Sequence, residues 1–310
     1  MPRTSWGDPD LTGDYSNKYE QGTPFERPAE FEGRSIGDVN GDELAALIEQ
    51  RGIQVILNAP FSGDPLAGNF GGAPAFYDQY EAGKGSRPWF VIDPPDGKIP
   101  PLTTSGRERA QAAAAARAAS RDESPSSYRD FNLYDRCVSR GFPNSMMPTN
   151  YGNSYTIVQA PGVVAVRYEM IHETRIIPLT PKPALSSAIP QFMGDAQGRW
   201  DGDTLVVETR NFRPELAYRD SNPATLKITE RFRRTAPDKV EWTVTVDDPE
   251  TWLRPWTFSM PLTLNPAERV FEYACHEGNM ALANMLSAAR AEERAAEGSS
   301  NTRARPRSAQ

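Results

Sequence analysis

The segment VVAVRYEMIHETR, Val163–Arg175, begins as a run of apolar and β-branched residues and ends in a charged cluster. Its first part is typical of a β-strand. His172, one of only two histidines in the chain, lies in the charged part. The residues around it are Glu169, Glu173, Arg167 and Arg175. The segment therefore predicts a strand that leads into a candidate site.

The strand pattern continues on both sides of this segment. Tyr155–Gln159 and Val163–Glu169 are joined by Ala160-Pro161-Gly162, which indicates a hairpin. Further runs with strand character are Trp89–Ile92, Arg175–Leu179, Thr204–Thr209, Leu226–Arg234, Val240–Asp247, Trp252–Met260 and Val270–Ala274. We expect a mainly β protein, an antiparallel lipocalin-like barrel of about eight strands. Such a barrel can hold one small apolar ligand.

Three other segments have helical patterns. Asp42–Gln50 and the Ala- and Arg-rich Arg107–Arg121 are helix candidates in the first half. Met280–Glu297 is amphipathic, and we expect it to pack on the outside of the barrel. The predicted division is an irregular N-terminal arm with short helices packing on the barrel (1–135), a barrel with a C-terminal helix (136–297) and a disordered tail (298–310).

The composition excludes several classes of partner. Among 310 residues, 34 are Lys or Arg and 41 are Asp or Glu, which gives a net charge of −7. This balance argues against a nucleic-acid partner. We find no apolar run long enough to span a membrane and no apolar signal-peptide core. The sequence leaves a homo-oligomer open.

Cysteine usage bears on the compartment. Cys137 and Cys275 are the two cysteines, and they could form one disulfide. So few thiols in a chain of this length are more typical of a reducing compartment. The predicted location is therefore cytoplasmic.

Motifs for cofactors and metals are missing from the sequence. It has no phosphate loop, dinucleotide fingerprint or paired Cys-x-x-Cys. His172, His276 and Glu169 have ligand types that suit zinc or iron, but their spacing requires no metal. We predict neither a cofactor nor a metal.

The two histidines are candidates for acid–base chemistry. His172 is next to Glu173, and a carboxylate neighbour can tune a histidine near neutral pH. The alternative is an inert histidine in a hairpin turn. His276 follows the last predicted strand, where a barrel mouth would lie. The alternative there is the start of the C-terminal helix, with Glu277 favoured at its N-terminus.

Arginine and aromatic residues are candidates for binding. Arg136 and Arg140 flank Cys137, and an arginine can hold a carboxylate or phenolate. The alternative is an ion pair with Asp135 or Asp130 that anchors a loop. A polar-aromatic segment suited to orienting an aromatic hydroxyl, or to forming a turn, contains Asn150, Tyr151, Asn153 and Tyr155.

Two further residues have competing interpretations. Trp256 is a core residue or a platform for a ligand. Glu230 and its neighbour Arg231 lie in an alternating strand, where we expect a solvated face or an interstrand ion pair.

Several segments together resemble a large, mostly uncharacterised family of bacterial proteins that is abundant in soil organisms and sphingomonads. These segments are RCVSRG, YGNSYTIVQAPGVVAV, EMIHETRIIPL, GRWDGDTLVVETRNF, LKITERF, DDPETWLRPWT and YACHEGN. The resemblance covers roughly residues 87–290. It implies a lyase of lignin-derived aromatic dimers, which converts a phenylcoumaran into a stilbene with loss of formaldehyde or carbon dioxide.

Residue roles for such a lyase come from the candidates above. His172 would be the acid or base, oriented by Glu173 or Glu169. Arg175, Arg136 or Arg167 would stabilise oxyanions, and Tyr151, Tyr155 and His276 would position the phenol, with Asn150 and Trp256 lining the site. The alternative function is a non-catalytic, lipocalin-like carrier of a small aromatic or apolar ligand. A purely structural role would instead predict a packed barrel with both histidines exposed.

Overall fold

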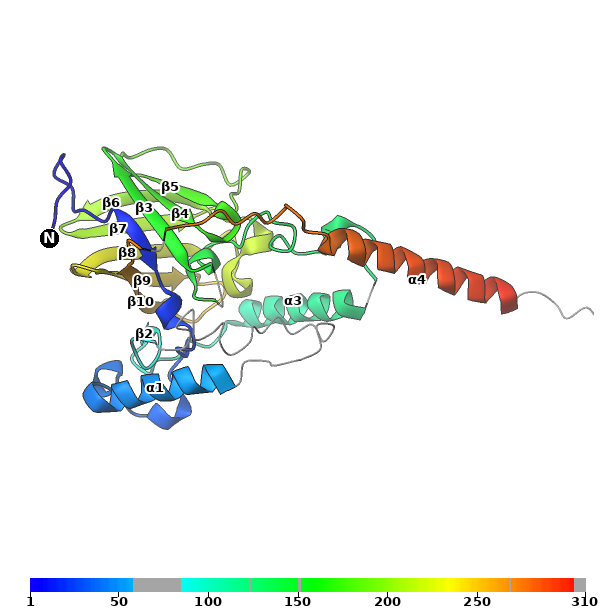
Figure 1. Ribbon diagram of the computed structural model, residues 1–310, viewed down its shortest axis with the longest axis horizontal. Helices are drawn as coiled ribbons and strands as arrows, with labels where there is room; N and C mark the ends of the chain where they lie inside the picture. Colours follow the sequence, from blue (N-terminus) through cyan, green and yellow to red (C-terminus); the bar gives the residue numbers. More distant parts are fainter. Residues whose placement is uncertain (58–84, 123, 150–151, 268, 304–310) are drawn as a thin grey trace, which may run out of the picture.

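The fold is built around one antiparallel sheet, seen in Figure 1. The computed structural model describes residues 1–57, 85–122, 124–149, 152–267 and 269–303. Nine strands follow each other in the order β5-β4-β3-β1-β10-β9-β8-β7-β6, and β2 pairs with β10 beside this path. The strands are β1 Gly13–Ser16, β2 Val91–Asp93, β3 Ser154–Ala160, β4 Val163–Tyr168, β5 Thr174–Pro178, β6 Asp195–Asp201, β7 Thr204–Arg210, β8 Lys227–Ala236, β9 Lys239–Asp247 and β10 Trp256–Leu264.

The sheet curls until its two end strands almost meet. An added Cβ on Gly198 of β6 would lie 2.8 Å from Ile177 Cγ2 of β5. The Gln197 side chain of β6 donates a hydrogen bond to Pro178 O of β5 at 2.9 Å, across the line where these two strands meet, which we call the barrel seam. No backbone pairing between β5 and β6 occurs in the described part of the sheet. The result is a nearly closed barrel, which confirms the predicted fold class.

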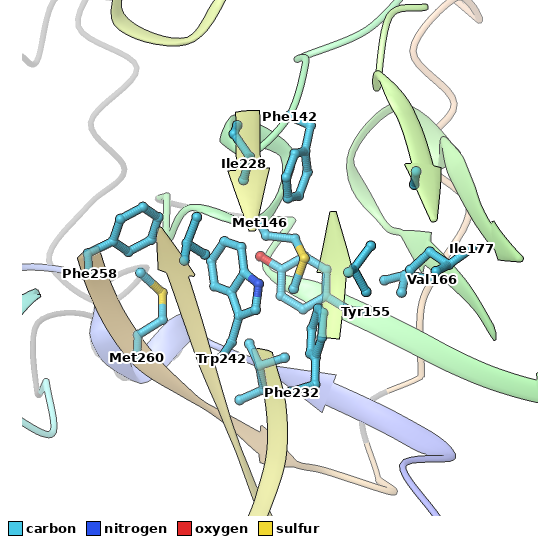
Figure 2. Packing of buried hydrophobic residues seen from close by; sticks show 14 of the residues in the cluster. Phe142, Met146, Tyr155, Val166, Ile177, Ile228, Phe232, Trp242, Phe258 and Met260 are labelled. Atoms are coloured by element: carbon cyan, nitrogen blue, oxygen red, sulfur yellow. The ribbon is translucent and has the colours of Figure 1, made fainter. Parts of the chain in front are cut away.

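Large side chains fill the inside of the barrel. Along β9, Val240, Trp242, Val244 and Val246 are buried, because every second residue points inward. Figure 2 shows Trp242 beside Met146, Tyr155 and Phe232 in this interior. Trp242 contacts Phe142 and Phe258 edge-on, with ring centroids 6.5 and 5.6 Å apart. The core is therefore close-packed in its middle and held by burial of apolar area.

One predicted strand is wrong, and two strands, β1 and β6, arise where none was expected, while β2 overlaps the predicted strand Trp89–Ile92. Val270–Ala274 forms no strand. The place beside β10 is taken by β1, where Tyr15 pairs with Leu264 and, on its other side, with Tyr155. β1 and β2 both come from the region predicted to be an irregular arm, so this arm contributes to the barrel itself. The domain boundary at residue 135 stays a prediction.

Helices lie outside the barrel. They are α1 Gly41–Leu57, α3 Thr104–Asp122 and α4 Ala281–Arg303, each overlapping a predicted helix. α4 does not pack on the barrel as expected; Figure 1 shows it extending away. Its Arg290 donates to the carbonyls of Pro125 and Ser126 at 2.9 Å. α4 also continues into the segment predicted to be disordered, of which residues 304–310 lie outside the described part.

A disulfide joins Cys137 to Cys275, with 5.8 Å between the Cα atoms. The sequence had left this pairing open. Disulfides are rare in the cytoplasm, so this bond weighs against the cytoplasmic location that the cysteine count predicted. No helix in the described ranges is long and apolar enough to cross a lipid bilayer.

Candidate functional site

One end of the barrel gathers most of the candidate residues. β3 and β5 begin there and β4 ends there, since Ser154 pairs with Ser16 and Arg167 with Thr174. We call it the loop end. The connections at this end include residues 132–147, 169–173, 211–226 and 248–255.

Residues 132–147, which we call the roof loop, cover this end. Phe142 and Met146 of the roof loop are fully buried, and Figure 2 shows them reaching into the barrel interior. The Asn17 side-chain amide donates to Met146 O at 2.7 Å and anchors the loop. Gly141 has a φ of +71°, which favours glycine, and an added Cβ would lie 3.1 Å from Leu216 Cβ. The roof loop is thus fixed to the 211–226 connection.

A pocket of about 320 Å³ lies on the roof loop. Leu133, Met147 and Leu216 supply apolar side chains to its wall. Polar or charged groups come from Asn132, Tyr134, Ser139, Arg140, Asn144 and Glu215. Small-molecule sites combine apolar surface with placed polar groups. We call this cavity the roof pocket.

Arg140 gives the roof pocket a cationic group with spare hydrogen-bonding capacity. Its Nη1 is buried and has no hydrogen-bond partner among the residues that the structure describes. Its guanidinium lies over the Tyr134 ring, 5.6 Å from the centroid. A buried donor without a partner is costly, and a carboxylate or phenolate would satisfy it. Arg140 is therefore suited to receive an anionic group.

Glu173 lies directly behind the pocket wall. Ser139 Oγ donates to Glu173 Oε2 at 2.9 Å. Burial raises the pKa of the Glu173 carboxyl, and the hydrogen bond from Ser139 opposes this shift only in part. Glu173 thus keeps its proton to higher pH than an exposed glutamate, as a general acid requires. Its neighbour His172 ends the short helix Met170–His172, but its side chain lies outside the described part.

Arg175 is placed deeper, inside the barrel. Its Nη2 donates to Glu230 Oε2 at 2.5 Å and to Thr209 Oγ1 at 2.6 Å. Trp242 Nε1 donates to Glu230 Oε1 at 3.0 Å, and the Phe142 ring lies 4.0 Å from the guanidinium carbon. Arg175 is only 3% exposed and Glu230 is fully buried. The ion pair is part of the packed interior and lies out of reach of a ligand in the roof pocket.

The interpretation of Glu230 as a solvated residue is wrong. Its position follows Ile228 and precedes Phe232 on the inward side of β8, which the strand's alternation already specified. Its neighbour Arg231 is on the outer face and pairs with Asp201 at 2.9 Å, as an interstrand ion pair would.

Tyr155 and Trp256 are buried core residues of the barrel. Tyr155 Oη donates to Asn17 Oδ1 at 3.0 Å. Trp256 is fully buried and packs edge-on against Phe25, 5.8 Å between centroids, and in a stack with Tyr218 at 6.2 Å. Neither lines the roof pocket.

The remaining candidates are spread around the loop end. Glu169 accepts a hydrogen bond from Ser154 N at 3.2 Å, and Arg167 is exposed on the outer face of β4. Arg136 lies over the Tyr128 ring at 5.1 Å. His276 is exposed and follows Cys275, whose disulfide holds this segment against the roof loop. Asn150 and Tyr151 lie outside the described residues.

Metal-ligating side chains do not converge. Among the residues that the structure describes, no group of three His, Cys, Asp or Glu side chains is arranged to hold an ion. The structure brings Glu173 together with Ser139 of the roof loop. His276 and Arg167 are exposed and Trp256 is in the barrel core, and none of the three lines the roof pocket. Arg140, which has no part in the residue roles expected for the lyase, lines the roof pocket.

Comparisons with known proteins add little to this geometry. No protein-family model and no curated protein matches the chain. Among solved structures, an abundant heat soluble (SAHS) protein from Ramazzottius varieornatus is similar over 43% of this chain and 87% of its own, with 12% identity and a TM-score of 0.24. A similarity of this size supports no argument about function.

Proposed function

We propose that the protein binds a small aromatic or apolar molecule with an acidic group in the roof pocket. The observation that carries this proposal is the buried Arg140 Nη1, which has no hydrogen-bond partner among the described residues, in a side chain that lines the pocket beside Leu133, Met147 and Leu216. The carboxylate of Glu215, which also lines the pocket, is paired with Arg213 at 3.0 Å. The volume of about 320 Å³ is near the lower end of ligand sites and suits a compact molecule. Because bulky side chains fill the barrel interior, the ligand sits on the roof loop and not in the lumen.

Calorimetric titration tests this proposal. The probes are a monocyclic aromatic carboxylate and its neutral methyl ester. We expect the carboxylate to bind, and the ester to bind at least about tenfold more weakly, because it cannot accept a charge-assisted hydrogen bond from Arg140. Arg140→Gln should abolish the difference between the two probes. Arg136→Gln, which changes a nearby arginine outside the pocket, is the matched control and should preserve it.

The second candidate is the carbon–carbon lyase that the family resemblance implies. It is favoured by Glu173, whose pKa is raised by burial and whose carboxyl is connected to the pocket through Ser139. In this reaction the bond to the departing carboxyl carbon or carbinol carbon breaks, and its electrons form the stilbene double bond. The dihydrofuran C–O bond breaks at the same time. From the alcohol, a base takes the hydroxyl proton as formaldehyde leaves; from the acid, the ionised carboxyl group leaves as carbon dioxide. Glu173, acting through Ser139, would supply a proton to the departing phenolate, while Arg140 would stabilise its negative charge.

Turnover distinguishes the two candidates. Incubation with a racemic phenylcoumaran, as alcohol and as acid, should produce stilbene absorbance if the protein is a lyase. Glu173→Gln should then remove turnover and keep binding. Binding without stilbene from either form would leave the carrier as the function. The cytoplasmic location and a homo-oligomer stay predictions, and the disulfide weighs against the former.

A further inference from the structure

The disulfide connects the roof loop to a segment outside the barrel. Cys137 is in the roof loop, two residues before Ser139, and it is 8% exposed with a φ of +56°. Cys275 is in residues 269–280, which form no helix or strand. The Asn279 side-chain amide donates to Cys275 O at 3.1 Å and adds a local contact at the same point. The disulfide therefore holds an irregular segment against the loop end.

This segment has little apolar anchoring of its own. Phe271 is 68% exposed and Met280 is 60% exposed, although both are large apolar residues. α4 begins directly after it, at Ala281. The barrel core, in contrast, is built from buried residues of the strands and the roof loop. Opening the disulfide therefore removes an anchor of the segment without removing a side chain from the barrel interior.

We propose that the Cys137–Cys275 disulfide is a redox latch, whose reduction releases residues 269–280 and the first turns of α4 while the barrel stays folded. A positive φ at a non-glycine residue is strained, and such strain persists only where the surroundings enforce it. The disulfide is one of the constraints on Cys137, and reduction lets the roof loop relax there. Local openings of this kind come from regions with few buried apolar contacts.

The exchange reaction has a defined direction. A dithiol reductant supplies the thiolate, which attacks the more exposed Cys275 Sγ and displaces Cys137 as a thiolate. The first step leaves a mixed disulfide between one sulfur of the reductant and Cys275 Sγ. The second thiol of the reductant then attacks the reductant's sulfur in this bond, which releases Cys275 as a thiol. Two electrons pass to the protein, which gains two thiols, and the reductant becomes a disulfide.

Hydrogen exchange read by mass spectrometry tests the latch on the full-length protein. The samples are the oxidised protein, the protein reduced with dithiothreitol, and the Cys137→Ser/Cys275→Ser double variant without and with dithiothreitol. We expect exchange in the first turns of α4 and in residues 132–140 to rise by at least about tenfold on reduction. The double variant should match the reduced protein and should not respond to dithiothreitol. Peptides from β8 and β9 should keep their protection in all samples.

Two results would overturn the proposal. Unchanged exchange in α4 and in residues 132–140 after reduction would show that the disulfide does not hold them. Loss of protection throughout β8 and β9 would show that it holds the whole barrel and is no latch. Neither result depends on a ligand. A second effect rests on the proposed function: reduction of the disulfide should weaken carboxylate binding in the roof pocket. If binding alone is unchanged, the disulfide does not influence the pocket, but the latch itself is not contradicted.

Discussion

The Arg175 guanidinium and the Glu230 carboxylate form an ion pair inside the barrel, with Nη2 and Oε2 2.5 Å apart. The pair joins β5 to β8, which are not neighbours in the sheet, and Trp242 donates to the same carboxylate. Glu230→Gln leaves the arginine charge buried without its counter-ion. We expect it to lower the free energy of unfolding in urea by about 3–5 kcal/mol.

The matched control for this pair is on the surface. Arg231 and Asp201 are both well exposed, so Arg231→Gln should cost no more than about 1 kcal/mol. The double variant Arg175→Met/Glu230→Gln should recover part of the loss, because it leaves no buried charge. A cost below about 1 kcal/mol for Glu230→Gln would contradict the placement of this pair in a dry interior.

Because of Glu173, the free energy of unfolding should fall as the pH rises. Burial raises the pKa of its carboxyl in the folded state, so the unfolded chain loses this proton at lower pH than the folded protein does. Its contribution is fully present below the unfolded pKa and is lost as the pH rises through the folded pKa. Glu173→Gln removes this dependence. Urea unfolding of both proteins from acidic to neutral pH should therefore show the variant gaining relative stability with pH, and a constant difference would disprove the shift.

Gly198 should tolerate no side chain at the barrel seam. An alanine Cβ would lie 2.8 Å from Ile177 Cγ2 and from Leu179 Cδ2, closer than atoms in contact normally approach. We expect Gly198→Ala to lower the free energy of unfolding by about 1–3 kcal/mol, and with it the melting temperature, since β5 and β6 must move apart. Gly37→Ala has open space around it and should stay within about 0.5 kcal/mol of the parent. Equal melting temperatures for the two variants would mean that the seam is open.

Tyr155 should prove structural and not ligand-binding. Tyr155→Phe leaves the buried Asn17 Oδ1 without its donor and should cost about 1–3 kcal/mol of unfolding free energy. Because Tyr155 lies below the roof loop, carboxylate affinity in the roof pocket should not change. Tyr128→Phe at the surface is the control for stability. If Tyr155→Phe instead lowered the affinity for the carboxylate without lowering the free energy of unfolding, Tyr155 would be a ligand-binding residue.

The strands with strict alternation could be predicted from sequence, and the short ones could not. β8 and β9 alternate over nine or ten residues, so their inward faces were evident. β1 has only four residues in a region rich in proline and glycine, too few for a period to show, whereas the apolar run Trp89–Ile92 did indicate β2. Val270–Ala274 has strand character but no place in the sheet, because β1 already pairs with β10.

The site was predictable only in its location. The charged cluster after Val163–Tyr168 does lie at the loop end, because a strand must deliver it there. Whether a given arginine faces a pocket or an internal carboxylate depends on long-range packing. Arg175 meets Glu230 from 55 residues away, and no local pattern contains that contact. The alternation of β8 could have identified Glu230 as inward-facing, since it lies two residues from both Ile228 and Phe232.

The position of β1 has a consequence for synthesis on the ribosome. Tyr15 is made long before Leu264, one of its two strand partners. The other partner, Tyr155, also follows it by more than a hundred residues. β1 therefore stays unpaired on one edge until β10 has left the exit tunnel. Such long-range strand pairing is slow, and it leaves this edge of the nascent chain exposed until β10 arrives.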